Sequence, residues 1–142
     1  MINKFLIICI FLLSSACELR SKLDKSAHLS YSSQYVDIKI DLKSKNKGLE
    51  WNGSKRYSYY GVLKAQLVLG KANEAILFLK PHNITVKYKD KKSLIYLDSI
   101  ADIGDFWSLP NWDKNGFRQD KIYIVFDDPD IDWSKVIIVE NR

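Results

Sequence analysis

Cysteine is nearly absent from this chain, which has only Cys9 and Cys17 among its 142 residues. Cys9 lies inside an apolar segment at the N-terminus that has the features of a removable signal. Once that segment is removed, Cys17 is the only cysteine left, so an intramolecular disulfide and a cysteine-based zinc site are both excluded. An exported domain of this composition must therefore be stabilised by its hydrophobic core.

Motifs for catalysis are also lacking. His28 and His82 are the only histidines, and the chain contains no Gly-x-Ser-x-Gly, His-Glu-x-x-His or phosphate-binding loop. We therefore expect that the protein is not an enzyme and that it needs no cofactor. A metal-dependent hydrolase would have to use aspartates such as Asp98, Asp102 and Asp105, and this alternative has the weakest support.

Long apolar runs are missing as well. The apolar segment near the N-terminus, Phe5–Leu13, has about half of the roughly 20 residues that a helix needs to cross a bilayer. Lys4 precedes it, and the small residues at 14–16 follow it. This order of a cation, a short apolar run and small residues is typical of a secretion signal, so residues 1–16 are predicted to be a signal peptide.

The end of that signal carries a recognisable motif. The residues Leu13-Ser14-Ser15-Ala16-Cys17 resemble the lipobox of bacterial lipoproteins. The resemblance implies cleavage after Ala16, diacylation of the Cys17 sulphur and attachment to a membrane, because several acyl chains together bind a bilayer stably. Because Glu18 follows the cysteine, it also implies an outer membrane location facing the periplasm in a Gram-negative envelope. The alternative is a plain secretory signal with Cys17 free or in a disulfide.

The mature chain has the composition of one folded domain. With 46% hydrophobic and 13% aromatic residues, it can bury enough apolar surface to fold, and its length suits a single domain. Residues 17–33 are serine-rich and predict a lipidated tether, with a short helix through Leu19 and Leu23 as the alternative. The β-rich domain is then expected at residues 34–142.

Alternation of apolar and polar residues dominates the chain from Tyr35 onward, which is typical of half-buried strands. In the clearest example, charged residues separate four apolar ones, Val36, Ile38, Ile40 and Leu42. Residues 45–54 contain several Asn and Gly residues and predict a loop. Residues 57–69 form a long β-prone run, which we expect to break near Gly61.

The rest of the chain adds shorter strands. Residues 84–88 and 94–97 predict a hairpin with a charged tip, and residues 122–126 and 136–139 predict two buried strands. Residues 72–79 fit a helix or a further strand about equally. The fold class is therefore mainly β, as a single small sandwich or barrel of six to seven strands with room for one short helix.

Two groups of residues are candidates for binding. Trp107 and Trp112 lie in a long segment without a regular period, and exposed tryptophans in such loops often bind sugars or protein partners. Lys87 and Lys89 alternate next to the hairpin tip, where they would reach lipid phosphates, an anionic glycan or an acidic protein. Both groups also have structural explanations, because tryptophans can cover the end of a core and lysines can protect a solvated edge.

A third candidate is an acidic segment with carboxylates at alternate positions, Asp128, Asp130 and Asp132. An EF-hand would need a glycine at the sixth position and a glutamate at the twelfth, where this chain has Trp133 and Val139. We therefore expect an acidic turn and assign no metal site, although a different kind of cation site stays open.

Charge is unevenly distributed along the mature chain. Residues 17–97 hold 16 basic and 7 acidic side chains, a net charge of +9, whereas residues 98–142 hold 5 basic and 10 acidic side chains, a net charge of −5. Such asymmetry can steer a charged partner. Alternatively, strands from the two halves intermix and their charges cancel at the surface.

These observations favour a protein that acts by binding. We expect a lipid-anchored cell-envelope protein that serves as a protein-interaction module, for example an inhibitor, an immunity protein or a subunit of an envelope assembly. Its partners would be the membrane, through Cys17, and another envelope or exported protein, with no nucleic acid. A module that binds a glycan or another small ligand is the alternative.

Overall fold

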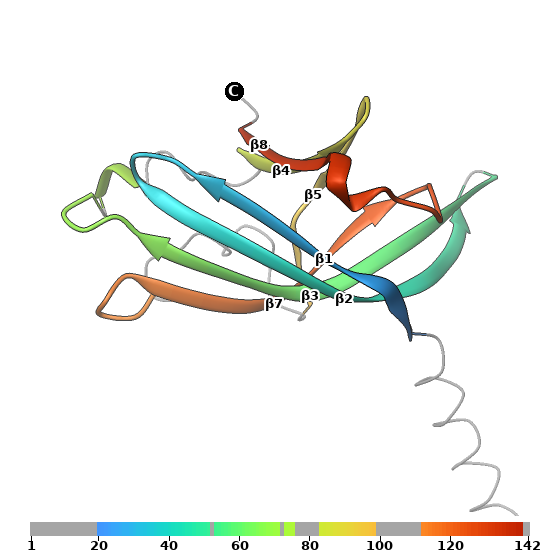
Figure 1. Ribbon diagram of the computed structural model, residues 1–142, viewed down its shortest axis with the longest axis horizontal. Helices are drawn as coiled ribbons and strands as arrows, with labels where there is room; N and C mark the ends of the chain where they lie inside the picture. The colour runs from blue at the N-terminus through green and yellow to red at the C-terminus, as the bar shows by residue number, and fades with distance from the viewer. Residues whose placement is uncertain (1–19, 52, 72, 76–82, 99–111, 141–142) are drawn as a thin grey trace, which may run out of the picture.

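Two antiparallel sheets make up the part of the chain that the computed structural model describes, which is residues 20–51, 53–71, 73–75, 83–98 and 112–140 (Figure 1). The longer sheet contains, in spatial order, β1 (Arg20–Ser32), β2 (Val36–Trp51), β3 (Ser54–Leu67), β7 (Phe117–Phe126) and β6 (Tyr96–Leu97). The shorter sheet contains β5 (Lys91–Leu94), β4 (Ile84–Tyr88) and β8 (Val136–Glu140). The predicted mainly β fold is confirmed.

The hydrophobic core lies between the inner faces of the two sheets, because alternate residues of each strand point inward. The alternating segment in β2 is the strand predicted from the sequence, and its four apolar residues are each at most 1% exposed. Ile38 pairs with Ala65 of β3, and Ile40 pairs with Leu63. The larger buried side chains from the other strands include Leu29, Tyr59, Val86, Ile122, Ile124, Phe126 and Ile138.

The predicted tether at residues 17–33 is wrong for most of its length, because Arg20–Ser32 forms strand β1 at the edge of the longer sheet. Ala27 and Leu29 are buried, and they alternate with exposed residues such as His28. An edge strand with serines on its solvent-exposed face has the same polar composition as a linker, so the sequence does not distinguish the two. The strand leaves only residues 17–19 of the predicted tether, and these lie outside the described residues.

The loop predicted at residues 45–54 is also wrong, since β2 continues to Trp51 and pairs with β3 up to Ser54. The register of this pairing shifts between Leu42 and Ser44 and again between Lys47 and Glu50. Bulges of this kind interrupt the alternation that marks a strand in the sequence. Trp51 and Ser54 are the last pair of this hairpin, and Gly53 just before Ser54 has a φ of +80°, which glycine adopts readily.

Strand β3 runs through Gly61 without the predicted break. A Cβ atom on Gly61 would lie 2.0 Å from the carbonyl oxygen of Asp41. Gly61 pairs with Leu42, next to the first bulge of β2. Glycine therefore allows the two backbones to approach at this point rather than ending the strand.

The predicted hairpin between β4 and β5 is confirmed, although its turn comes earlier than expected. Tyr88 pairs with Lys91, and Lys89 in the intervening turn has a φ of +56°. After β5 the chain changes sheets, because β6 pairs with β7 of the longer sheet. This change, together with β1, gives eight strands in the described residues, where six to seven were expected.

The remaining segments agree with the sequence in part. Strands β7 and β8 contain the two buried strands predicted near the C-terminus. Residues 73–75 are helical, and the N–H of Ala75 donates to the carbonyl oxygen of Lys71, so the ambiguous segment begins as a helix. Its later residues lie outside the described part of the chain. In that part, no helix is long and apolar enough to span a membrane.

Candidate functional site

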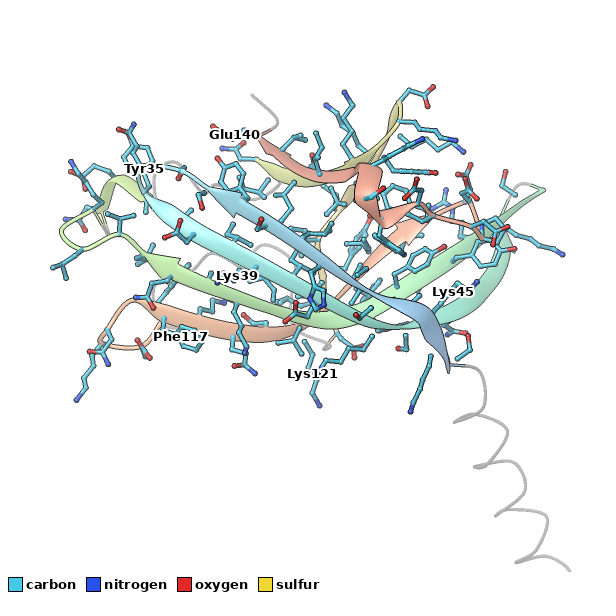
Figure 2. The ribbon with its side chains drawn as sticks, in the orientation of Figure 1. Tyr35, Lys39, Lys45, Phe117, Lys121 and Glu140 are labelled. Carbon is cyan, nitrogen blue, oxygen red and sulfur yellow. The ribbon has the colours of Figure 1, made fainter. Side chains whose placement is uncertain are left out.

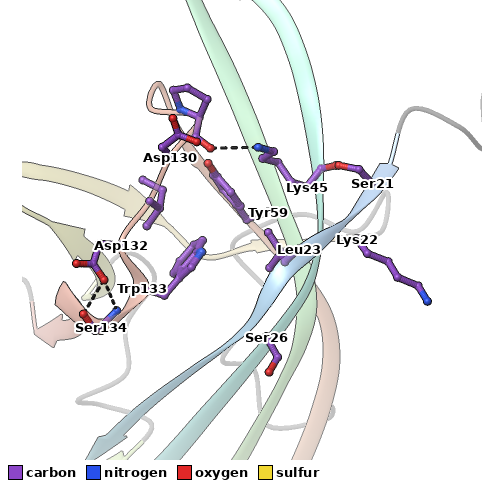
Figure 3. A pocket seen from close by; sticks show the side chains of 12 residues that line it. Ser21, Lys22, Leu23, Ser26, Lys45, Tyr59, Asp130, Asp132, Trp133 and Ser134 are labelled. Carbon is purple, nitrogen blue, oxygen red and sulfur yellow. Dashed lines mark hydrogen bonds between the residues drawn. The ribbon is translucent and has the colours of Figure 1, made fainter.

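The two sheets converge at one end of the edge strands β1 and β8 and diverge at the other. At the converging end, the Tyr31 hydroxyl donates a 3.0 Å hydrogen bond to the Glu140 carboxylate. At the diverging end, a cleft of about 700 Å³ lies between the first residues of β1 and the segment at residues 129–134 (Figure 3). We define this space as the inter-sheet cleft.

Aromatic and aliphatic side chains line the interior of the inter-sheet cleft. Tyr59 of β3 is buried beneath it, and the ring of Trp133 meets the Tyr59 ring edge-on with a centroid distance of 5.0 Å. Leu23 and Ile131 add aliphatic surface. Figure 3 shows Tyr59, Trp133 and Leu23 directed toward the same space. The cleft therefore offers apolar contact to a ligand that enters from the open side.

Charged side chains lie around this apolar interior. The Lys45 ammonium group donates a 3.1 Å hydrogen bond to the carbonyl oxygen of Pro129, which connects β2 to the opposite wall. Asp130 and Asp132 line the same wall, whereas the side chain of Lys22 points away from the cleft in Figure 3. The cleft thus combines an apolar interior with one cation and two carboxylates at its border.

Local irregularities in the chain put these side chains in place. The bulge between Leu42 and Ser44 shifts the alternation of β2 by one residue, so Lys45 pairs with Tyr59 and points to the inner side. On the opposite wall, the Asp132 carboxylate accepts hydrogen bonds from the N–H and the hydroxyl of Ser134. Asp132 thereby caps the short 3-10 helix Trp133–Lys135, which holds Trp133 at the cleft.

The electrostatic environment of Tyr59 keeps its hydroxyl protonated. Burial raises the pKa of Tyr59 above its usual range, and the negative charges of Asp128 and Asp130 raise it further. The hydroxyl donates a 2.6 Å hydrogen bond to the carbonyl oxygen of Asp128. Tyr59 therefore acts as a hydrogen-bond donor at neutral pH.

A second cleft, of about 540 Å³, is lined by the start of β3, by strand β5 and by the end of β7. We define it as the basic cleft, because Arg56, Lys91 and Lys92 line it together with a single carboxylate, Asp127. The Lys91 ammonium group lies 2.6 Å from that carboxylate. This hydrogen bond lowers the pKa of Asp127 and raises that of Lys91.

The residues predicted for binding are not brought together. Trp112 is half-buried and packs against the core, in keeping with the structural explanation, and Trp107 lies outside the described residues. Lys87 is half-buried in β4, whereas Lys89 lies in the turn with its ammonium group 5.1 Å from the centre of the Tyr88 ring. Lys87 and Lys89 therefore do not share a strand face, which corrects that part of the prediction. The proposed lipidation site, Cys17, also lies outside the described residues.

The acidic segment makes local hydrogen bonds. The Asp128 carboxylate accepts from the N–H of Asp130, and Asp132 caps the 3-10 helix. Within the described residues, no group of three or more His, Cys, Asp or Glu side chains is arranged to hold a metal ion. Asp102 and Asp105 lie outside that part of the chain. The acidic turn is thus what the described residues support.

The two differently charged halves of the chain meet in the fold. Lys45 reaches the carbonyl oxygen of Pro129, and Lys91 pairs with Asp127. Strand β7 of the acidic half also lies beside β3 of the basic half. These contacts favour the explanation in which the charges largely cancel, with the basic cleft as a local exception.

Sequence reasoning did not identify Tyr59 and Trp133 as site residues. In the sequence, Trp133 stands where an EF-hand would need a glycine, and Tyr59 lies within a β-prone run. One available signal was period two, since Tyr59, Gly61 and Leu63 share a face and Leu63 is a typical core residue. Nothing in the local sequence indicates that Trp133 meets Tyr59, because 74 positions separate the two residues.

Comparison with known proteins gives no assignment. No family model matches the chain, and neither a curated protein nor a solved structure matches it.

Proposed function

We propose that this chain is a lipid-anchored cell-envelope protein that acts as a protein-interaction module, such as an inhibitor, an immunity protein or an assembly subunit. The anchor is supported by the resemblance of Leu13–Cys17 to a lipobox and by the short apolar run before it. In a Gram-negative cell this protein would face the periplasm from the outer membrane.

The observation that carries the binding proposal is the half-buried Trp133 in the inter-sheet cleft, whose ring packs on the buried Tyr59 ring. Tryptophan and tyrosine contribute strongly to protein interfaces when they lie in a pocket that a partner can close off from water. Tyr59 is fixed by its hydrogen bond to Asp128, and Trp133 is fixed by the capped turn around it. Such rings lose little conformational entropy when a partner binds.

The edge strand β1 favours a protein partner. Within the described residues, β2 is the only strand that pairs with β1. Among the described residues, no strand therefore pairs with the opposite edge of β1, where Ser21, Leu23 and Ser26 border the inter-sheet cleft. An extended segment of a partner can add to such an edge through backbone hydrogen bonds while a side chain enters the neighbouring pocket. A polypeptide can satisfy both parts of this surface at once.

Site-specific photocrosslinking of the lipidated protein in its own envelope tests this proposal. With the photoreactive residue at Ser26, beside the inter-sheet cleft, we expect one discrete crosslinked protein. The same residue at Lys64, on the outer face of the longer sheet, is the matched control and should not capture that protein. Trp133→Ala should weaken the Ser26 crosslink, whereas Ile137→Ala, at an exposed apolar residue of β8, should not. Equal capture at Ser26 and Lys64 would refute a partner at the cleft.

Glycan or small-ligand binding is the second candidate, because an aromatic pair bordered by Asp130 and Asp132 also suits a sugar. Titration with peptidoglycan fragments, followed by tryptophan fluorescence, tests it. A saturable change that is lost in Trp133→Phe but kept in Trp112→Phe would favour a glycan. An unchanged spectrum together with a Ser26 crosslink would favour the protein partner.

A further inference from the structure

We propose that the basic cleft faces the membrane and binds anionic phospholipid headgroups there, at the end of the molecule that carries the proposed anchor. This inference rests on the proposed lipid at Cys17. It adds an orientation on the bilayer and a second membrane contact, neither of which follows from the anchor alone.

The distance between the proposed lipid and the domain is short. Strand β1 begins at Arg20, and three residues of extended chain span at most about 10 Å. A domain held by such a short connection cannot rotate freely above the bilayer. The surface around the start of β1 must therefore lie close to the headgroups.

A chain of contacts connects the start of β1 to the basic cleft. The Ser21 hydroxyl donates to the carbonyl oxygen of Lys45, and the Lys45 ammonium group donates to that of Pro129. Two residues before Pro129, Asp127 pairs with Lys91 at the border of the basic cleft. The basic cleft therefore lies at the same end of the sheets as the proposed anchor. Figure 2 shows Lys45 at this end and Tyr35 at the other.

Charge complementarity identifies the occupant. Three cations and one carboxylate line the basic cleft, and Arg56 and Lys92 are exposed. Phosphate groups of acidic lipids accept hydrogen bonds from guanidinium and ammonium groups, and each basic residue near a charged bilayer strengthens its attraction. A bilayer that carries the anchor supplies such phosphates at high local concentration.

The test uses the mature lipidated protein in lipid discs that contain a headgroup-attached quencher. A fluorophore is placed through Ser54→Cys at the basic cleft, or through Leu69→Cys at an exposed turn of the opposite end. Strand β3 runs from Ser54 to Leu67, and Leu69 follows two residues later. The two label positions are therefore about 40 Å apart. Because the proposed lipid occupies Cys17, the introduced thiol is the only free one.

We expect strong quenching at Ser54 and little at Leu69 in discs that contain phosphatidylglycerol. The double variant Arg56→Gln/Lys92→Gln should lower the equilibrium constant for headgroup contact at Ser54 about thirtyfold, since two cations are lost near the surface. The matched variant Lys64→Gln/Lys121→Gln removes the same charge from the outer face and should leave the quenching unchanged. Replacing phosphatidylglycerol with phosphatidylcholine should lower the quenching at Ser54 as Arg56→Gln/Lys92→Gln does.

The possible failures are distinguishable. Mass spectrometry of the same sample shows whether Cys17 carries lipid, and its absence would refute the anchor itself. Lipidated protein with equal quenching at Ser54 and Leu69 would overturn the orientation while leaving the anchor in place. If quenching at Ser54 stays equally strong in Arg56→Gln/Lys92→Gln and in discs without anionic lipid, headgroup binding by the basic cleft would be overturned.

Discussion

The Tyr59 hydroxyl donates a 2.6 Å hydrogen bond to the carbonyl oxygen of Asp128, which lies 69 positions further along the chain. The same tyrosine ring contacts Trp133 edge-on and lies near Phe126. Tyr59 therefore connects the longer sheet to the segment that forms the opposite wall of the inter-sheet cleft. The position of Trp133 depends on this connection.

Replacing Tyr59 with phenylalanine should destabilise the protein through the loss of one hydrogen bond. The Asp128 carbonyl group would lose its donor while the ring contacts are kept, so we expect a loss of about 1 kcal/mol in the free energy of unfolding. Urea unfolding at neutral pH measures this. Tyr57→Phe is the control, because the Tyr57 hydroxyl makes no hydrogen bond within the described residues. Equal losses in both variants would contradict the assigned role of the Tyr59 hydroxyl.

The same variant should change how stability depends on alkaline pH. Burial raises the pKa of Tyr59, whereas an unfolded tyrosine ionises near pH 10.0. Below that pH the residue is neutral in both states and its full contribution is present. Above it the unfolded chain loses a proton that the folded chain keeps, so stability falls as pH rises. Unfolding experiments above pH 10 should show a shallower decline for Tyr59→Phe than for the unchanged protein.

Removing the Lys91 ammonium group should raise the pKa of Asp127 toward its ordinary value of 3.8. In the unchanged protein this lowered pKa contributes stability above about pH 4, and the contribution is lost as pH falls through the folded-state value. Both side chains are about half exposed, so the effect on stability should be small. Carboxyl carbon NMR shifts of Asp127 in Lys91→Met report the change directly. Lys92→Met should shift the Asp127 titration less, and an equal shift would contradict the pairing.

The strands with uninterrupted alternation were predictable from sequence. Val36–Leu42 follows the period of two that one buried face imposes, and the strands near the C-terminus are short apolar runs rich in β-branched residues. The second half of β2 was missed because its bulges break that period. Strand β1 was missed because an edge strand with a serine-rich wet face has the composition of a linker. A local sequence pattern predicts a strand correctly where the strand pairing is regular. It does not predict the strand where a bulge or an edge position, set by the neighbouring strand, changes the pattern.

The candidate site was less accessible to sequence reasoning. Its principal residues, Tyr59 and Trp133, come from segments far apart in the chain and meet because the sheets diverge. Trp112 has the local context of a binding loop but packs against the core. Whether a tryptophan packs in the core or lines a cleft thus depends on which strands it packs against, and a single sequence does not specify these strands.

Adding one methyl group at Gly61 should destabilise the fold. In Gly61→Ala the new Cβ atom would lie 2.0 Å from the Asp41 carbonyl oxygen and 2.7 Å from the Leu42 Cα atom, and both are backbone atoms. Because neither can move without disturbing the pairing of β2 and β3, we expect a loss of about 2–3 kcal/mol. Thermal unfolding measures it, with Lys64→Ala on the exposed side of β3 as the control. A near-neutral Gly61→Ala would mean that the two backbones are further apart than described.

Arg118 and Asp120 of β7 form an ion pair that points into the space between the sheets, with the Arg118 side chain only 1% exposed. Removing one member of such a pair costs more than removing both, because the buried Arg118 guanidinium group then loses the Asp120 carboxylate to which it donates. Asp120→Ala should therefore lower the free energy of unfolding by about 3 kcal/mol. The double variant Arg118→Met/Asp120→Leu should recover much of that loss, since it replaces the pair with apolar groups. Denaturant unfolding of the two variants gives the comparison, and a double variant less stable than Asp120→Ala would show that Arg118 stabilises the fold mainly through its other contacts.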